Sequence, residues 1–437
     1  MKQQNSYRSA FIVITILFFL WGFITVLVDS LIPRLRDVFA LSYFEAGLVQ
    51  FAFFIAYFVF SVPAGFLLSK IGYKKGIIIG LTTMALGCLL FYPAASMRLF
   101  WIFLLGYFAL AGGITILQVA ANPYVAVLGS EAGASSRLNL SQAFNSLGTA
   151  IAPILGAMFL LSDSIKSSEE ITALSELEQE AYYLSEAAAV QKPFVFLAIC
   201  IGILAISFIF IKLPKILEKA PKGGYGKLLR NKTVLLGVFG IFLYVGAEVT
   251  IGTYLVNYFL DMKLEFVIAE NTFLRGFAER ILNAQLEAKD SKAIVGAFVT
   301  LYWSGAMVGR FIGAYLTKMW QPSKVLGTFA VLAVIMLIIS MNSMGITAML
   351  SILAVGLFNS IMFPTIFTLT LEGLGDLKPQ ASGLLCMAIV GGAIIPPAYG
   401  FLTDNFGFKI ALLLLIACYG YILYFGMRKR KSINGFN

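Results

Sequence analysis

Three ionisable residues lie inside long apolar stretches of the chain, where a charge needs a specific reason to be present. Asp29 follows the apolar run 10–28, Glu248 lies within Tyr244-Val-Gly-Ala-Glu-Val-Thr, and Arg310 lies within the stretch 293–317. An ionised group at the centre of a lipid bilayer costs roughly 2.5–3.5 kcal/mol on insertion scales. Such groups persist mainly where they face a cavity or a partner. Asp29 is therefore either an acid at the end of a helix or a cavity carboxylate that exchanges a proton. Glu248 is either a second such acid or half of a buried structural pair.

Uncharged amides form a larger set of polar residues inside the same kind of stretch. Their spacing groups them, since residues three or four apart share one face of a helix. The amides are Gln118 with Asn122, the series Asn139, Gln142 and Asn145, and Asn359. An amide both donates and accepts hydrogen bonds, which suits a solute rich in hydroxyl groups. The alternative is hydrogen bonding between helices, worth about 0.6 kcal/mol per contact.

Aromatic residues make up 14% of the chain, and Trp303 is among those that could stack on the apolar face of a sugar. Most aromatic residues are expected to pack or to anchor helices at the membrane interface. The sequence has no histidine, no phosphate-binding GxxxxGK[ST] motif and no metal-ligand or nucleophile pattern. Its four cysteines all lie in apolar runs. We therefore expect no enzyme activity, no cofactor and no metal.

The elements that must position these residues are about a dozen apolar runs. The chain is 59% hydrophobic and 12% charged, with a mean hydropathy of +0.89, whereas a soluble domain carries about 25% charged residues. A helix needs about 20 apolar residues to cross a bilayer. The pattern predicts an all-α polytopic membrane protein with twelve transmembrane helices. We place them at 10–33, 46–68, 76–95, 99–128, 138–161, 193–213, 233–260, 293–317, 324–342, 345–371, 380–402 and 408–427.

Basic residues gather in segments that fall on one side of the membrane under this count. The connection 212–232 holds seven lysines and arginines against one acid, and further basic residues occur at 74–75 and 428–431. Lysine and arginine are retained on the cytoplasmic side. Both termini are therefore predicted to be cytoplasmic, and the acidic loop 163–192 external. The net charge of +10 is explained by these loops, so we expect no nucleic acid partner.

The two halves of the chain resemble each other. Gly65-Phe-Leu-Leu-Ser-Lys at the end of the second span matches Gly313-Ala-Tyr-Leu-Thr-Lys at the end of the eighth. Gln118 lies five residues before Pro123, and Asn359 lies five before Pro364. Pro153-Ile-Leu-Gly likewise matches Pro397-Ala-Tyr-Gly. The repeats predict two pseudo-symmetric six-helix bundles, 1–213 and 233–437, joined by a basic cytoplasmic linker at 214–232. A duplicated bundle with a site between its halves is typical of secondary transporters.

Several motifs resemble a known family. Gly65-x-x-x-Ser-Lys-x-Gly-x-Lys-Lys is similar to the loop 2–3 signature of the major facilitator superfamily, with Ser69 in place of its usual acid. The strings "FFLWGF", "LVQFAFFIAYF", "ITILQVAANPYV", "SRLNLSQAFNSLGT", "FLYVGAEV" and "GRFIGAYL" together resemble the fucose–galactose–glucose:proton symporter family, most closely its bacterial glucose/galactose branch. This resemblance covers nearly the whole chain except 163–192 and 261–292, and it implies the major facilitator fold.

The resemblance also implies roles for single residues. Asp29 matches an aspartate that the fucose permease uses in proton coupling, and Gln142 and Asn145 match amides near its sugar. Gln118 stands where that permease has a second essential glutamate, so its proton relay cannot be carried over intact. The glucose/galactose branch resembles this chain in having glutamine there, and Glu248 is also typical of that branch. Glu248 is therefore a candidate for the missing role.

Together these observations favour a transporter of a neutral hexose, glucose or galactose, that works by alternating access and is driven by protons. We expect Asp29 and Glu248 to carry protons. The expected sugar ligands are Gln118, Asn122, Gln142, Asn145, Asn359 and Trp303. Gating is assigned to Gly65 and Lys70 of the loop signature and to Arg310, which we expect in a cytoplasmic charge cluster rather than in the sugar site.

Several alternatives stay open at this point. The protein could be a uniporter or a sodium-coupled symporter, or it could carry L-fucose. A sensor would need a cytoplasmic output domain, and the longest predicted cytoplasmic loop has only about 20 residues. A channel fits the repeat with its central amides less well than alternating access does. We expect a monomer in the inner membrane of a bacterium.

Overall fold

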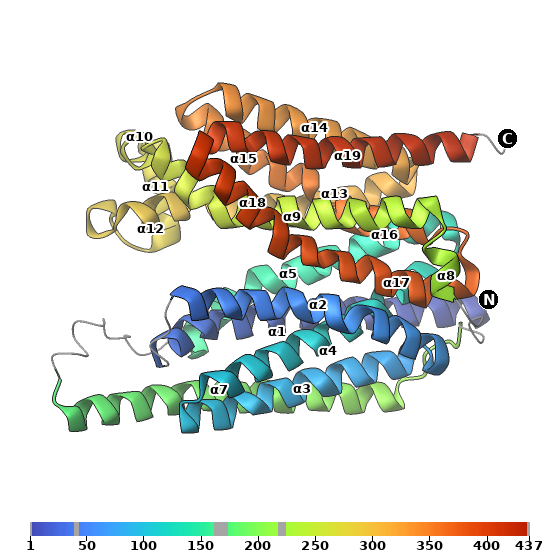
Figure 1. The fold of residues 1–437 in the computed structure, drawn as a ribbon, viewed down its shortest axis with the longest axis horizontal. Helices are drawn as coiled ribbons and strands as arrows, with labels where there is room; N and C mark the ends of the chain where they lie inside the picture. Colours follow the sequence, from blue (N-terminus) through green and yellow to red (C-terminus); the bar gives the residue numbers. More distant parts are fainter. Residues whose placement is uncertain (1, 39–42, 161–173, 217–223, 435–437) are drawn as a thin grey trace. The chain divides into compact units, whose positions relative to one another are not determined.

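The computed structural model describes residues 2–38, 43–160, 174–216 and 224–434, and every regular element in these ranges is helical. The long helices of the N-terminal part are α1 (Lys2–Val38), α2 (Tyr43–Ile71), α3 (Tyr73–Met97), α4 (Phe100–Val127), α5 (Ala134–Leu160) and α7 (Glu176–Phe210). The short α8 (Gly224–Leu228) follows. The C-terminal part comprises α9 (Lys232–Asp261), α10 (Leu264–Glu270), α11 (Thr272–Leu282), α12 (Ser291–Gly296), α13 (Val299–Met319), α14 (Pro322–Asn342), α15 (Gly345–Asn359), α16 (Met362–Leu371), α17 (Lys378–Met387), α18 (Gly391–Phe406) and α19 (Phe408–Asn434) (Figure 1).

The predicted transmembrane spans are confirmed as helices. Within the described residues, eleven segments are long and apolar enough to cross a membrane, and α5 covers the remaining predicted span, 138–161. Some spans are interrupted. The tenth is built from α15 and α16, and the eleventh from α17 and α18 with a short 3₁₀ turn between them. The observed helices therefore agree with the predicted twelve-helix fold class.

The helices group into two compact units that do not coincide with the two sequence halves. Unit 1 comprises residues 1–129, 144–228 and 373–387, and unit 2 comprises residues 130–143, 229–372 and 388–437. The first part of α5 thus packs with helices of the C-terminal half, and α17 packs with α2 and α4 of the N-terminal half. The predicted boundaries 1–213, 214–232 and 233–437 describe the repeat in the sequence and stay a prediction.

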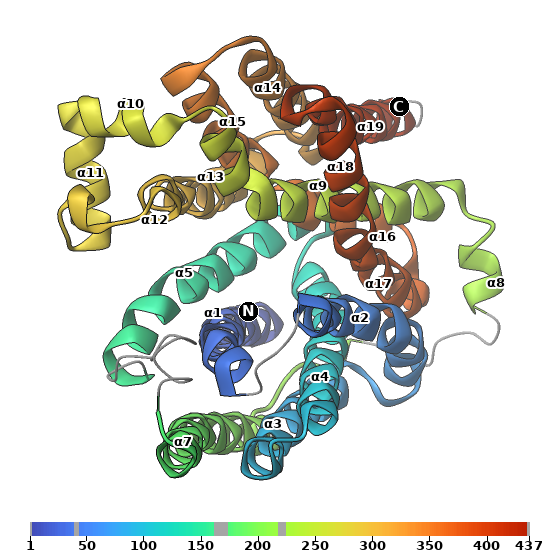
Figure 2. The same cartoon turned by 60° about the vertical axis from the view of Figure 1, so that its left-hand side comes forward.

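The segment between α9 and α13 forms a small helical group at one end of unit 2. Helices α10, α11 and α12 lie beyond the end of α9 (Figure 2). Asn271 caps α11 by accepting hydrogen bonds from the backbone N–H groups of Phe273 and Leu274, and Asp290 caps α12 in the same way through Ala293. The group places the predicted loop 261–292 at the opposite end of unit 2 from the turn between α13 and α14.

Candidate functional site

The interruption between α15 and α16 creates a free backbone acceptor in the interior of unit 2. Proline has no N–H group, so Pro364 cannot donate to the carbonyl oxygen four residues earlier, that of Ser360. The Arg310 side chain in α13 takes over this role, because its Nε donates to the Ser360 oxygen at 3.2 Å. A buried carbonyl without a donor is costly, which explains why a polar side chain of the neighbouring helix is directed at this point.

The same guanidinium group forms a buried ion pair. Arg310 Nη2 lies 3.6 Å from Glu248 Oε1, and the two side chains are only 16% and 15% exposed. At this separation the contact is an ion pair rather than a close hydrogen bond. The structure differs here from the expectation that Arg310 belongs to a separate cytoplasmic cluster: α13 places it beside the most deeply buried acid of α9. Removing either member would leave a buried charge without compensation.

The amide of Asn359 joins two tyrosines of unit 2. Its Nδ2 donates to the hydroxyl of Tyr302 at 2.7 Å and to that of Tyr419 at 3.2 Å, and all three residues are fully buried. Asn359 Oδ1, Glu248 Oε1 and the Tyr244 hydroxyl have no hydrogen-bond partner among the described residues. The site therefore offers both acceptors and a donor, the groups with which a hydroxylated solute is bound.

Two glycines allow α13 and α15 to approach closely enough for these contacts. A Cβ at Gly309 would collide with the Leu357 carbonyl, and a Cβ at Gly356 would collide with the Tyr302 carbonyl. The side chains that follow or face these glycines, Arg310 and Tyr302, consequently reach the end of α15. Small residues at a helix crossing are typical of membrane bundles.

Trp303 lies on the outer side of this arrangement. It is 47% exposed, its ring packs edge-on against Tyr302 with centroids 5.0 Å apart, and it covers Gly252 of α9. The structure therefore places Trp303 next to the buried tyrosine and not inside the polar cluster. A role in sugar binding stays a prediction.

Unit 1 contains the same kind of proline-generated acceptor. Pro123 in α4 leaves the Val119 carbonyl without its helical donor, and the Ser382 hydroxyl in α17 donates to that oxygen at 2.9 Å. Ser382 and Asn122 are both fully buried. Here an uncharged hydroxyl group donates to the freed carbonyl. This hydroxyl belongs to a segment from the other half of the sequence.

The amide next to this carbonyl also binds a tyrosine. Gln118 is 8% exposed, and its Nε2 donates to the hydroxyl of Tyr57 in α2. The arrangement repeats the one around Asn359, whose partner Tyr302 lies in the matching eighth span. The two halves of the sequence share the spacing Gln118–Pro123 and Asn359–Pro364. This repeat thus extends to the hydrogen-bonded partner of each amide.

The amides of α5 fall on either side of the division between the units. In unit 1, Asn145 Nδ2 donates to the Phe18 carbonyl in α1 at 2.9 Å. In unit 2, Asn139 Nδ2 donates to the Ser135 carbonyl at 2.9 Å and to the Thr365 hydroxyl at 3.2 Å, and Gln142 is 7% exposed. Asn139 and Asn145 thus each donate to a neighbouring helix, and a role of Asn145 in sugar binding stays a prediction.

Gly65 of the loop signature lies where three segments of unit 1 meet. A Cβ at this position would come within 2.7 Å of the Tyr225 hydroxyl and 2.9 Å of the Pro379 carbonyl. The Tyr225 hydroxyl in α8 donates to the Val62 carbonyl at 2.6 Å. Gly65 therefore allows α8 and α17 to approach α2, and its gating role stays a prediction.

The remaining residues considered from the loop signature, Ser69 and Lys70, contact Phe66 of their own helix. Lys70 Nζ lies 4.1 Å from the centroid of the Phe66 ring, a cation–π contact. The Ser69 hydroxyl, which replaces the usual acid, donates to the Phe66 carbonyl of its own helix at 2.7 Å. Ser69 thus supplies no charge to the contact, and the gating role of Lys70 stays a prediction.

Asp29 lies in α1, but its side chain is outside the described residues. Sequence reasoning missed the roles of Tyr244, Tyr419 and Ser382, because a single hydroxyl-bearing residue in an apolar run carries little signal. The two prolines were the available clue, since each identifies a carbonyl four residues earlier that needs a new donor.

Comparison with known proteins defines the class. Residues 10–274 match the family model of the Major Facilitator Superfamily, and the chain belongs to this superfamily. The predicted family resemblance is thereby confirmed.

The most informative relatives are bacterial sugar transporters. The chain is 45% identical to the glucose/galactose transporter of Brucella abortus (strain 9-941) over 99% of this chain and 96% of the relative. It is 41% identical to a putative glucose/galactose transporter of Helicobacter pylori (strain J99), over 98% of this chain and 99% of the relative. Among solved structures, the crystal structure of the E. coli fucose:proton symporter has a TM-score of 0.85 at 31% identity, covering 97% of this chain and 99% of the other.

Proposed function

We propose that this protein carries a neutral hexose, glucose or galactose, across the inner membrane of a bacterium in symport with protons. The observation that carries the proposal is the near full-length similarity to glucose/galactose transporters, at 45% identity over 99% of the chain. The uncharged amide–tyrosine pairs of both units support it, because a hexose offers hydroxyl groups and no net charge. Basic loops in the sequence support an orientation with both termini in the cytoplasm.

The sugar ligands are assigned unit by unit. In unit 1 they are Gln118, Asn122 and Asn145. In unit 2 they are Gln142, Asn359 and Trp303. Asn359 has the strongest support of these residues, since its Oδ1 is buried without a hydrogen-bond partner among the described residues, and a sugar hydroxyl can donate to it.

Proton coupling is assigned first to Asp29 and second to Glu248. Glu248 lies beside Arg310 in an ion pair, so a proton taken up by Glu248 would remove the negative charge of that pair. Asp29 is placed first because it matches the proton-coupling aspartate of the fucose permease.

The direct test is uptake of labelled glucose into proteoliposomes, with and without an imposed pH gradient, in competition with unlabelled galactose and L-fucose. We expect uphill uptake that needs the pH gradient and is competed by galactose. Asp29→Asn is expected to abolish accumulation and to spare exchange of sugar at equal pH. Equal accumulation by the variant and the parent protein would contradict the role of Asp29.

L-fucose is the second candidate substrate, because the chain is also 33% identical to the L-fucose-proton symporter of Escherichia coli over 98% of its length. Stronger competition by L-fucose than by galactose would favour it. Accumulation driven by a sodium gradient would replace the proton by sodium, and equilibration without any gradient would identify a uniporter.

A further inference from the structure

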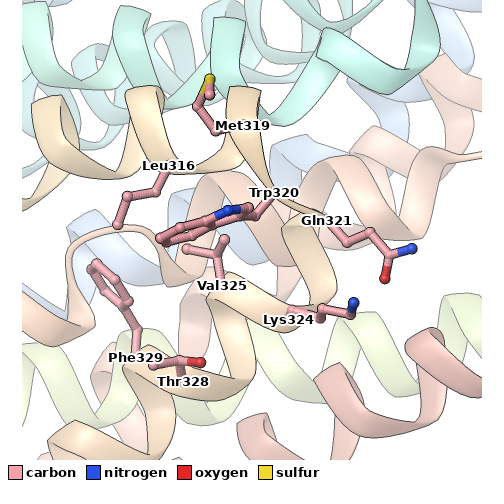
Figure 3. Close-up of a pocket in the computed structure, with 8 residues that line it drawn as sticks. All are labelled: Leu316, Met319, Trp320, Gln321, Lys324, Val325, Thr328 and Phe329. Atoms are coloured by element: carbon pink, nitrogen blue, oxygen red, sulfur yellow. The ribbon is translucent and has the colours of Figure 1, made fainter.

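A groove opens at the turn between α13 and α14 (Figure 3). Its volume is about 550 Å³. One part of the lining is apolar and comes from both helices, whereas Gln321 and Lys324 lie on the other side of the Trp320 ring. The apolar lining residues include Leu316, Trp320, Val325 and Phe329. The groove thus combines a hydrocarbon-like part with a polar end.

The floor of the groove belongs to the packed interior of unit 2. Val325, Phe329 and Ile361 form a buried apolar cluster, and Leu316 and Phe358 pack against it. Phe329 and Phe358 meet edge-on with centroids 6.0 Å apart. The floor is therefore formed by packed side chains of several helices, so the groove is part of the folded interior of unit 2.

The mouth of the groove continues into surfaces suited to lipid. Trp320 is 63% exposed and Met319 is 60% exposed at its edge. From there an exposed apolar stripe runs along each helix away from the turn. The stripes are Phe311, Ile312 and Tyr315 on α13, and Val331, Ile335 and Ile338 on α14. An exposed tryptophan at the end of such stripes is typical of the membrane interface.

The polar end of the groove has a positive charge. Lys324 lines it and is exposed, and residues 311–329 contain no aspartate or glutamate. The N-terminus of α14 adds the partial positive charge of its helix dipole, and its N-cap residue, Gln321, makes no side-chain capping hydrogen bond. This end of the groove therefore attracts an anion.

Gln321 adds a second, independent requirement. Its Oε1 is buried and finds no hydrogen-bond donor among the described residues. An amide oxygen accepts hydrogen bonds only, so an occupant that carries a donor as well as a negative charge fits this end of the groove. A phosphate diester linked to a hydroxylated head meets both requirements, whereas a choline head has a phosphate and no donor.

We infer that this groove binds one anionic phospholipid of the phosphatidylglycerol type. Lys324 and the α14 N-terminus face the phosphate, Gln321 accepts a hydrogen bond from the glycerol head, and an acyl chain lies against Leu316 and Phe329. The cytoplasmic leaflet is the source if the proposed orientation is correct. The binding itself does not depend on transport.

Native mass spectrometry of the purified protein tests this inference. The probes are phosphatidylglycerol, phosphatidylmethanol, which has the same charge without the hydroxyl groups, and phosphatidylcholine, all with the same acyl chains. We expect phosphatidylglycerol to bind best. Lys324→Gln is expected to lower its bound fraction about fivefold, the size of effect expected for one basic residue at a lipid surface, and Trp320→Ala is expected to lower it as well. Gln321→Leu should remove only the preference over phosphatidylmethanol.

The matched controls are Trp101→Ala, at a tryptophan that is 70% exposed at the start of α4, and Lys292→Gln, at an exposed lysine of α12. Both should bind phosphatidylglycerol like the parent protein. Unchanged binding in Trp320→Ala and Lys324→Gln would overturn the inference. So would equal binding of phosphatidylglycerol and phosphatidylcholine, which would indicate an acyl-chain groove only. A loss of dimers with unchanged lipid binding would assign the groove to a second copy of the chain.

Discussion

In both units a proline leaves a backbone carbonyl without its helical hydrogen-bond donor, but a different side-chain group replaces that donor in each unit. In unit 1, Pro123 frees the Val119 carbonyl, and the uncharged Ser382 hydroxyl donates to it at 2.9 Å. In unit 2, Pro364 frees the Ser360 carbonyl, and the charged Arg310 donates to it at 3.2 Å. In both units the residue just before the freed carbonyl is an amide that donates to a tyrosine hydroxyl.

The difference between the units lies in the charge at these two matching positions. A hydroxyl group satisfies one carbonyl and adds nothing further to the electrostatics. Arg310 satisfies the carbonyl and brings a positive charge, which Glu248 balances at 3.6 Å. The duplicated frame thus provides two equivalent positions, of which one is neutral and the other is an ion pair. The ion pair can respond to a proton or to a change in helix position, whereas the hydroxyl contact can only form or break.

Removal of the guanidinium should have the largest effect. Arg310→Leu leaves Glu248 as a buried charge without a partner and Ser360 without a donor, so we expect a loss of about 3–5 kcal/mol in the free energy of unfolding. Thermal unfolding in detergent measures the loss, and proteoliposome uptake should fall to background.

A double variant separates stability from function. Arg310→Leu combined with Glu248→Leu removes both charges and should recover much of the lost stability, since a buried pair is often replaceable by apolar residues. Uptake should stay at background if the pair takes part in transport. Full uptake by the double variant would reduce the pair to a structural role.

Restoring the backbone donor should have the next largest effect. Pro364→Ala supplies an N–H group for the Ser360 carbonyl and so competes with Arg310. The charge-assisted hydrogen bond at stake is worth about 1.5–3 kcal/mol, so we expect uptake to fall about tenfold or more while the protein remains folded. Pro123→Ala, the matched variant in unit 1, should lower uptake less. An equal effect of the two variants would contradict the difference between the units.

The neutral contact can be isolated with a double-mutant cycle. Ser382→Ala leaves the Val119 carbonyl without a donor, at a cost of about 1–3 kcal/mol. In the Pro123→Ala background that carbonyl has a backbone donor again, and the same substitution should cost much less. Chemical or thermal unfolding of the four proteins gives the coupling energy. Additive effects would show that Ser382 does not serve this carbonyl.

The smallest effect is expected at an exposed ion pair outside the spans. Arg275 contacts Glu279 at 3.2 Å and Glu287 at 2.6 Å. The backbone N–H of Glu287 and the Arg275 guanidinium hold the pKa of Glu287 below its usual value, which is about 4.3. The ionised Glu287 side chain therefore stabilises this segment at pH values above its usual pKa of about 4.3. This contribution is lost as the pH falls through the lowered pKa.

Hydrogen exchange of residues 272–288 measures this contribution. Arg275→Gln should speed exchange slightly at pH 7 and leave uptake unchanged, because exposed pairs contribute little. Exchange in the parent protein should approach that of the variant at acidic pH, after correction for the intrinsic exchange rate. An effect as large as that of Arg310→Leu would contradict the distinction between buried and exposed pairs.

Much of this arrangement was predictable, and the remainder has a physical reason. The twelve spans follow from apolar runs of sufficient length, and the duplication follows from the spacing of Gln118 and Asn359 to their prolines. The contact of Arg310 with the Ser360 carbonyl was not predictable, because it depends on how closely α13 approaches α15 at Gly309 and Gly356. The role of Ser382 depends on α17 packing with α4, a contact between residues far apart in the chain.

The grouping of α17 with unit 1 has a consequence for how the protein is made. Residues 373–387 complete a unit whose other segments end at residue 228, and at typical rates the ribosome needs roughly 10–30 s to synthesise the intervening chain. During that interval the Val119 carbonyl lacks Ser382. The first unit therefore reaches its final form only late in synthesis, and a nascent chain that stops before α17 is expected to be a substrate for membrane proteases.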